Sequence, residues 1–245
     1  MAPSRRADYG YDAPSGLFGF GGVALVLLVL ALIHALLGRR VPALVEGLCG
    51  LLFLLTFLGY LYSTRKGKFL IWSELLKGFP LRGDEQVLDM GCGRGAVLSM
   101  IAKRIPNGRA FGLDLWSSVD QSGNNREATL ANLEAESVRE RCTVETGNMM
   151  AMPFPDAMFD AVVSSLAIHN IWGQAGRFKA LEEAARVLKP GGRLMIVDLL
   201  FPHVYARHLR DIGMEKVAHQ FVSWRGWFGM PLLTAVVTAE KPRRG

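Results

Sequence analysis

The nine residues from Val87 to Gly95, Val-Leu-Asp-Met-Gly-Cys-Gly-Arg-Gly, constrain the fold of this 245-residue chain more than any other stretch. The apolar run that leads to Asp89 is typical of a buried parallel strand. The glycines at alternate positions that follow predict a tight turn, because glycine adopts backbone conformations closed to other residues. A helix after such a turn presents free N–H groups to a negatively charged group. The segment therefore predicts a strand, a glycine-rich loop and a helix that together cradle a nucleotide-like cofactor.

The acid before this loop bears on which cofactor it holds. Gly91, Gly93 and Ala96 satisfy the dinucleotide pattern G-x-G-x-x-G/A, which alone is a weak signal. Asp89 argues against a dinucleotide, because its carboxylate would repel a pyrophosphate bound two residues away. A cofactor with a cationic centre and a free amino group tolerates an acid there, and S-adenosylmethionine, with its sulfonium and α-amino group, fits that description. An NAD(P)-binding oxidoreductase remains an alternative, ranked after the two functions given at the end of this subsection.

At this point the sequence resembles the class I S-adenosylmethionine-dependent methyltransferases, and is most similar to the branch of ubiquinone/menaquinone C-methyltransferases. Four blocks in the family's order carry the resemblance: Val87–Gly95; Gly112-Leu113-Asp114; Gly147-Asn148-Met149 with Met152–Asp156 and Phe159-Asp160; and Leu188–Leu194 around Lys189-Pro190-Gly191-Gly192. Together they cover roughly residues 69 to 240. Four blocks in order are far more specific than any one of them.

The resemblance implies a set of cofactor-binding residues: Asp89, Gly91, Cys92, Gly93, Asp114, Leu115, Asn148, Met149 and Ser165. The resemblance implies that Asp89 holds the amino-acid portion of the cofactor, directly or through water. Asp114, 21 residues after Gly93, would accept hydrogen bonds from both ribose hydroxyls. Asn148 stands where the family often carries Asp; its amide oxygen can still accept from the adenine amino group, although it lacks the charge.

The segment Ser164–Asn170 should line the methyl-transfer site. Methyl transfer is an in-line displacement, so positioning supplies much of the acceleration, and a base is needed only if the acceptor still holds its proton. His169 has a pKa suited to that role near neutral pH, with a structural role as the alternative. Asn170 could orient a substrate. We therefore take His169 and Asn170 as the candidate catalytic residues.

Two apolar runs precede this region. No Asp, Glu, Lys or Arg occurs between Asp12 and Arg39, and Leu17–Leu37 is almost wholly apolar, long enough at ~1.5 Å per residue to cross the ~30 Å hydrocarbon core of a bilayer. Val41–Tyr62 follows with a single charge, Glu46. A signal peptide is the alternative for the first run, but no clean small-residue cleavage site follows it. We expect two transmembrane helices, with a buried or re-entrant hairpin as the alternative.

Topology follows from the charges and the cofactor. A cytosolic cofactor places the catalytic domain in the cytoplasm, so a hairpin returns both of its ends there. The flanking cations agree with the positive-inside rule: Arg5, Arg6, Arg65, Lys66 and Lys68 lie inside, against Arg39 and Arg40 outside. Membrane lipids are therefore expected partners. No basic stripe with interleaved aromatic residues suggests nucleic acid, in spite of a net charge of +6.

After Tyr62, strand and helix patterns alternate, which predicts an α/β, Rossmann-like, doubly wound sheet. The strands expected are Gln86–Met90, Ala110–Asp114, Cys142–Glu145, Phe159–Ser164, Arg193–Leu199, Val217–Trp224 and Leu232–Glu240. The last two strands are joined by a turn at Gly229-Met230-Pro231, with no helix between them. The sheet is therefore expected to have seven strands, mostly parallel, with an antiparallel last strand. We divide the chain into an N-terminal tail (1–16), a transmembrane hairpin (17–64) and a methyltransferase domain (65–245).

Few other features point to a function. Three distant cysteines give neither a disulfide framework nor metal-ligand spacing, so no metal is expected. Trp224–Phe228 is rich in aromatic residues and could wall an acceptor pocket or touch the bilayer, with core packing as the alternative for Trp224. The sequence thus predicts a membrane-anchored methyltransferase acting on a small, hydrophobic or membrane-located acceptor. The alternative is a non-catalytic membrane-anchored module that binds S-adenosylmethionine, favoured only by Asn148.

Overall fold

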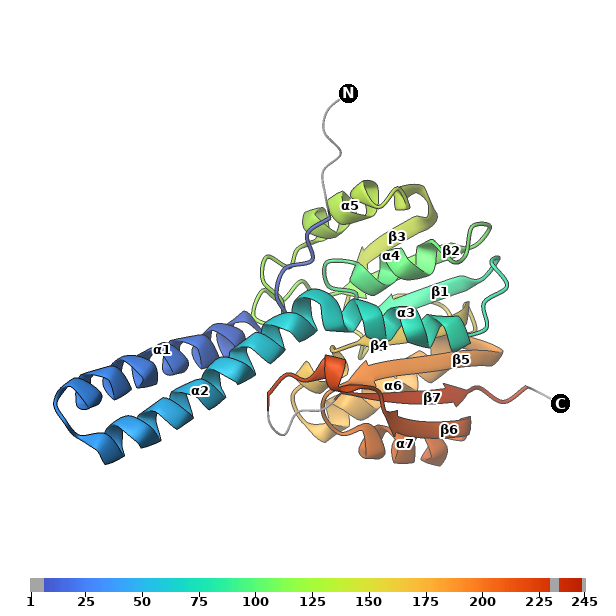
Figure 1. Cartoon of the computed structure of the whole chain (residues 1–245). Coiled ribbons are helices and arrows are strands. Elements are labelled where there is room, and N and C mark those ends of the chain that lie inside the picture. The colour runs from blue at the N-terminus through green and yellow to red at the C-terminus, as the bar shows by residue number, and fades with distance from the viewer. Residues whose placement is uncertain (1–6, 230–233, 244–245) are drawn as a thin grey trace, which may run out of the picture.

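Seven strands form one sheet in the order β3-β2-β1-β4-β5-β7-β6, as the computed structural model of residues 7–229 and 234–243 shows (Figure 1). The strands are β1 Gln86–Met90, β2 Arg109–Asp114, β3 Cys142–Thr146, β4 Phe159–Ser165, β5 Leu188–Asp198, β6 Glu215–Phe221 and β7 Ala235–Glu240. β1 to β5 pair in parallel, and β7 pairs antiparallel with both β5 and β6. The predicted α/β doubly wound sheet is therefore confirmed, antiparallel last strand included. Arg5, Arg6, part of the predicted 229–231 turn and the first two residues of the predicted strand Leu232–Glu240 lie outside the described residues.

Helices cover both faces of the sheet. One face carries α3 (Lys68–Gly78), α4 (Ala96–Ala102) and α5 (Arg126–Ala135), and the other carries α6 (Gln174–Val187) and α7 (Pro202–Asp211). Neighbouring residues of β1 point to opposite faces, so that Val87 packs with Trp72 and Leu98 on the first face, while Leu88 packs with residues of α6 and α7 on the second. A strand buried on both faces is apolar along its whole length. The apolar run before the glycine loop therefore predicted β1 correctly.

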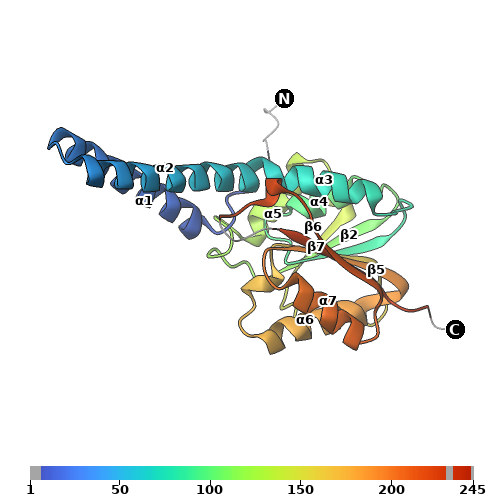
Figure 2. The same ribbon diagram turned by 60° about the horizontal axis from the view of Figure 1, so that its bottom comes forward.

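Two long apolar helices project away from the domain as a hairpin (Figures 1 and 2). They are α1 (Pro14–Leu36) and α2 (Arg40–Tyr62), of 23 residues each, and they pack against one another. In each, only 11% of the most apolar window is buried, with mean hydropathy of 2.6 for the first and 2.1 for the second. Both are long and apolar enough to cross a membrane, and most of their large side chains are exposed.

The hairpin is joined to the domain without a flexible linker. α2 continues through a π-helical turn, Ser63–Gly67, directly into α3, so residues 40–78 form one long helix. A β-carbon on Gly67 would lie 1.9 Å from the carbonyl oxygen of Arg225, which shows how closely the segment Trp224–Phe228 approaches this turn. The end of the chain therefore helps to hold the root of the hairpin in place.

Residues 7–13 cross the domain surface before α1 begins. The peptide N–H of Ser122 donates to the carbonyl of Tyr11, and that of Ala13 donates to the carbonyl of Asp120, at 2.9 and 2.8 Å. Asp8 forms an ion pair with Arg94 of the glycine loop at 3.1 Å. This segment, which the sequence suggested only as a tail, is thus packed on the same side of the sheet as the predicted site.

Candidate functional site

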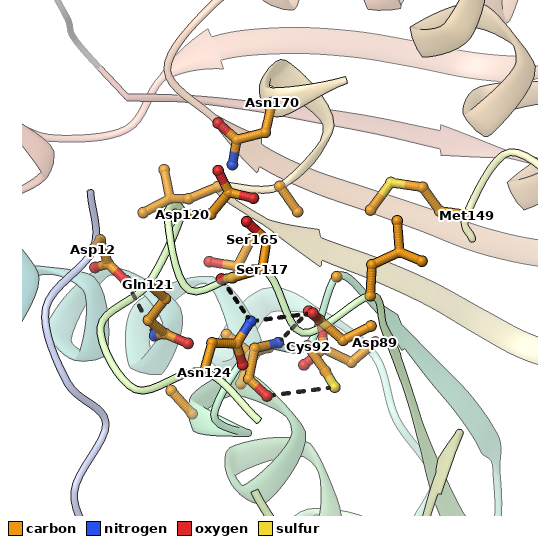
Figure 3. Close-up of a pocket in the computed structure, with 18 of the residues that line it drawn as sticks. Asp12, Asp89, Cys92, Ser117, Asp120, Gln121, Asn124, Met149, Ser165 and Asn170 are labelled. Carbon is orange, nitrogen blue, oxygen red and sulfur yellow. Dashed lines mark hydrogen bonds between the residues drawn. The ribbon is translucent and has the colours of Figure 1, made fainter. Parts of the chain in front are cut away.

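A cavity of about 270 Å³ lies beyond the carboxyl ends of β1, β2 and β4, where open parallel sheets bind ligands. It is lined by the glycine loop, by the segments after β2, β3 and β4, and by residues from both ends of the hairpin. Figure 3 shows polar side chains reaching into it from several of these segments. Every cofactor-binding residue expected from the sequence lines it: Asp89, Gly91, Cys92, Gly93, Asp114, Leu115, Asn148, Met149 and Ser165.

The glycine loop is shaped by close backbone approach. Gly91, Gly93 and Gly95 all have positive φ, at 75°, 50° and 80°. A β-carbon on Gly91 would lie 2.3 Å from the β-carbon of Ala167, so the loop has no room for a side chain there. The peptide N–H groups of Gly91 and Cys92 both donate to the carbonyl of Leu113, at 2.7 and 3.1 Å. The loop is therefore held against the end of β2.

Asp89 is the most unusual charged group of the site. Its side chain is 1% exposed and lines the cavity, and neither carboxylate oxygen has a hydrogen-bond partner within the protein. Burial, and secondarily the charge of Asp114, raise the pKa of Asp89 to about 8. A buried acid without a partner, facing an open cavity, fits a ligand that brings a cationic donor such as an amino group.

Asp114, at the end of β2, fixes the opposite side of the loop. Its carboxylate accepts from the peptide N–H groups of Gly93 at 2.7 Å and Trp116 at 2.6 Å. The amide of Asn124 donates to it at 3.2 Å. One acid thus braces both the glycine loop and the turn after β2, with oxygen lone pairs left for ligand hydroxyls.

The turn after β3 carries Asn148 and Met149. The side-chain oxygen of Asn148 accepts from the peptide N–H of Met150 at 2.9 Å, which makes a local turn. Its second lone pair and its NH₂ group remain for a ligand, while Met149 borders the cavity. The predicted adenine contact therefore stays a prediction, and the structure adds that the amide also holds its own turn.

The two candidate catalytic residues differ in where they lie. Asn170 lines the cavity, and Figure 3 shows its amide directed toward Asp120. His169 is not among the lining residues; its Nδ1 is paired with a carboxylate oxygen of buried Asp198, and its peptide N–H donates to the other oxygen at 3.0 Å. Burial lowers the pKa of His169, but the hydrogen bond and charge of Asp198 outweigh it, so the pKa is raised overall. The structure thus places Asn170 at the site and His169 behind it.

Cys92 and Ser165 complete the inner wall. Burial, with the charges of Asp89 and Asp114, raises the pKa of the Cys92 thiol well above its usual range, so the thiol stays neutral. The hydroxyl of Ser165 accepts from the indole N–H of Trp72 at 2.8 Å. No group of three or more potential metal ligands occurs in the part of the chain that the structure describes.

Two polar residues at the root of the hairpin reach the cavity: Asp12, which sequence reasoning missed, and Lys68, which it assigned to the membrane face. Asp12, two residues before α1, and Lys68, at the start of α3, both line it and form an ion pair of 2.9 Å. Asp12 also accepts from the hydroxyl of Thr64 at 2.8 Å and the amide of Gln121 at 3.2 Å. Asp12 was the last charge before the apolar run, and nothing in its local pattern distinguished it from an ordinary residue next to a helix.

Comparison with known proteins agrees with this geometry. Residues 88–196 match the methyltransferase domain family. A demethylmenaquinone methyltransferase of Symbiobacterium thermophilum is 32% identical over 148 residues, 60% of this chain and 54% of that protein. The ubiquinone/menaquinone biosynthesis C-methyltransferase UbiE of Dinoroseobacter shibae is 34% identical over 172 residues, 70% of this chain and 61% of the relative. The chain thus spans little more than half the length of these curated relatives.

The fold has relatives among solved structures as well. The crystal structure of an S-adenosylmethionine-dependent methyltransferase from Aquifex aeolicus superposes with a TM-score of 0.56 at 20% identity, over 69% of this chain and 88% of that one. This likeness concerns the fold. The domain match and the unpartnered acid that faces a glycine-lined cavity support S-adenosylmethionine as the cofactor.

Proposed function

We propose that the protein is a membrane-anchored S-adenosylmethionine-dependent methyltransferase, on the basis of the methyltransferase domain matched by residues 88–196. In this proposal it transfers the methyl group of S-adenosylmethionine to a small lipophilic acceptor. The cofactor supplies an electrophilic methyl group on a sulfonium. The residues of this chain bind and orient the two reactants and exclude water.

The observation that carries the proposal is the state of Asp89. Its unpartnered, buried carboxyl would hold the α-amino group of the cofactor, directly or through water. Asp114 would receive the ribose hydroxyls while it braces Gly93. Gly91 lets the loop pack against Ala167 at the cavity wall, since a β-carbon there would lie 2.3 Å from the β-carbon of Ala167. These residues fix the position of the cofactor, which matters most in an in-line displacement.

The hairpin supports membrane anchoring. Each helix is about 35 Å long at ~1.5 Å per residue, which suits a bilayer core of ~30 Å. Exposed Arg65 and Lys66 lie at its root, and exposed Arg39 and Arg40 at its tip. A cytosolic cofactor would place the root, and with it the catalytic domain, on the cytoplasmic side.

The proposed acceptor class rests on the relatives and on the cavity. Two matched relatives are named for quinones, demethylmenaquinone in one and ubiquinone/menaquinone in the other. In this chain the cavity has apolar side chains at its rim, among them Leu115 and Trp172, which are 61% and 98% exposed. A lipophilic molecule is the natural ligand for such a rim.

Asn170 and His169 are proposed to act together. Asn170 would orient the acceptor from the cavity wall. His169, whose backbone and ring are both bound by Asp198, would hold the turn Ile168–Asn170 in place. Because its ring does not line the cavity, we propose His169 as a positioning residue rather than as the base.

A labelled methyl group tests the proposal. The full chain in lipid vesicles is incubated with S-adenosylmethionine carrying a deuterated methyl group and a lipid extract of the source organism. We expect S-adenosylhomocysteine to form and the label to appear in one lipid-soluble product by mass spectrometry. The matched control is Asp89→Asn, which should lose the signal. Binding of the cofactor without any transfer would favour the non-catalytic module instead.

A further inference from the structure

Aromatic and basic side chains surround the root of the hairpin. We call this set the neck collar; its members are Tyr62, Arg65, Lys66, Trp224, Arg225 and Trp227. The ring of Trp224 stacks on that of Tyr62 with centroids 5.7 Å apart and an interplanar angle of 14°. Trp224 is nevertheless 67% exposed, so it does not pack in the core. In water such a pair is unfavourable because it leaves apolar ring surface exposed, whereas at a membrane–water interface that surface contacts lipid.

The rest of the collar is fixed to the same place. The hydroxyl of Ser63 donates to the carbonyl of Trp227 at 2.8 Å, and a β-carbon on Gly59 would lie 2.6 Å from the ring of Trp227. Arg65 and Arg225 are exposed, and the guanidinium of Arg65 lies 5.1 Å from the centroid of the Tyr11 ring. The collar is therefore a cluster of packed aromatic rings with exposed cations beside them, of the kind found at the headgroups of anionic lipids.

The length of the hairpin sets the depth of the cavity. If the 23-residue helices span the hydrocarbon core, their common root at Pro14 and Tyr62 lies at its edge. The helix continues without a break to Lys68, which lines the cavity roughly 9 Å further along at ~1.5 Å per residue. Headgroup layers are roughly 5–8 Å thick on each side. The cavity wall at Lys68 therefore lies at about the outer edge of the headgroups.

The mouth of the cavity also faces the bilayer side. The hairpin projects from the end of the domain at which β1, β4 and β5 terminate (Figure 1). The segments after β2 and β4 lie at this end, and they carry three strongly exposed apolar residues. Leu115, Val119 and Trp172 are 61%, 73% and 98% exposed, and Leu115 and Trp172 line the cavity. Exposed apolar residues gathered at one opening mark a contact surface rather than scattered surface positions.

We infer that the neck collar seats the domain on the lipid headgroups, so that Leu115, Val119 and Trp172 meet the bilayer and the acceptor enters the cavity sideways from the membrane. The inference rests on the proposed membrane anchoring and adds the route of access. The occupant of this surface is lipid of the cytoplasmic leaflet, with anionic headgroups opposite the cations of the collar. The acceptor would then reach the cavity through the headgroup layer, without passing through bulk water.

Tryptophan fluorescence tests this contact in the full chain. The protein is reconstituted into vesicles of phosphatidylcholine and phosphatidylglycerol, with or without a lipid that carries a nitroxide quencher near the headgroup. The signals of Trp172 and Trp224 are isolated by subtraction with Trp172→Phe and Trp224→Phe. We expect the nitroxide lipid to remove most of both signals, and aqueous iodide to remove little of either.

A tryptophan at the opposite end of the domain is the matched control. Ile212, at the end of α7 and 36% exposed, lies at the amino ends of the parallel strands. Ile212→Trp should be quenched by iodide and spared by the nitroxide lipid. Phosphatidylcholine alone should give weaker nitroxide quenching of Trp224, because the cations of the collar then lose their anionic partners.

The outcomes separate this inference from the proposed function. Protein that floats with the vesicles while Trp172 stays open to iodide would overturn the access route and leave the anchoring intact. Protein that does not float would overturn the anchoring itself, and the route with it. Quenching of both tryptophans by the nitroxide lipid supports both.

Discussion

The protonation of Asp89 gives the sharpest prediction about the cofactor. In the cofactor-free protein, burial and the charge of Asp114 raise the pKa of this carboxyl to about 8, so at pH 7 it is protonated in most molecules. A cationic amino group in the cavity favours the carboxylate instead. Binding at pH 7 should therefore release a proton, roughly 0.9 per cofactor bound.

The same reasoning fixes how affinity changes with pH. Deprotonating a group of pKa 8 at pH 7 costs about 1.4 kcal/mol, a factor of about ten in affinity. The dissociation constant of S-adenosylmethionine should thus fall by about tenfold from pH 6 to pH 7. Measurements are kept below about pH 7.5, where the ligand's own amino group is still charged.

Asp89→Asn is the matched variant, since it keeps the size of the side chain and removes the proton. It should bind about 10- to 100-fold more weakly, as expected for a lost charge-assisted hydrogen bond, and release no proton. Without cofactor the variant should unfold at the same temperature or higher at pH 7.5. The reason is that unfolding of the natural protein frees a carboxyl whose pKa is raised in the folded state, which favours the unfolded chain. Calorimetry in buffers of different ionisation enthalpy measures both quantities. Equal proton release by the two proteins would refute the assignment of Asp89.

Three further predictions concern other parts of the site and the hairpin root. Asp114→Asn places an NH₂ group beside backbone donors and should raise the dissociation constant of S-adenosylmethionine about 10- to 100-fold by calorimetry. Asp198→Asn should lower the pKa of His169 in an NMR titration, because Asp198 raises that pKa. The stabilisation that Asp198 provides through protonated His169 is complete below about pH 6.5 and is lost as the pH rises through the pKa of His169 in the folded protein. The variant should therefore lose more thermal stability at pH 5 than at pH 8. Gly67→Ala places a β-carbon 1.9 Å from a backbone oxygen and should destabilise the protein by about 1–3 kcal/mol in chemical denaturation, whereas Gly78→Ala, with nothing within 4 Å, should not.

The sequence predicted the sheet well because its strands are buried on both faces. β1 has the bounds predicted from the apolar run, Gln86–Met90, and the other strand predictions differ by a few residues at their ends. The register bulge between β4 and β5 lies at the predicted Lys189–Gly192 turn, which the structure includes in a longer β5. Such differences at strand ends reflect hydrogen bonds to neighbouring strands, which a single sequence does not display.

The residues that the sequence proposed for the cofactor all line the cavity, because each lies near the end of a recognisable strand or just after one. Asp12 was not predicted as a site residue and Lys68 was assigned to the membrane face, because their place in the cavity comes from long-range packing between the hairpin root and the loop at Gln121. His169 was predicted as a catalytic residue, but the sequence did not show its partner Asp198, which ends a strand 29 residues later. The role of an isolated acid or histidine depends on the residues that it contacts in the folded protein. A local sequence pattern does not show these contacts.

Photochemical labelling of the cavity tests the central claim most directly. The full chain is irradiated with ultraviolet light in the presence of S-adenosylmethionine that carries a labelled methyl group, and the modified peptides are mapped by mass spectrometry. We predict label on peptides that border the cavity, around residues 89–96 or 147–150, with its loss in the presence of excess S-adenosylhomocysteine and in Asp89→Asn. Label confined to peptides away from the cavity, or a folded protein that takes up none, would contradict the assignment of this site to S-adenosylmethionine.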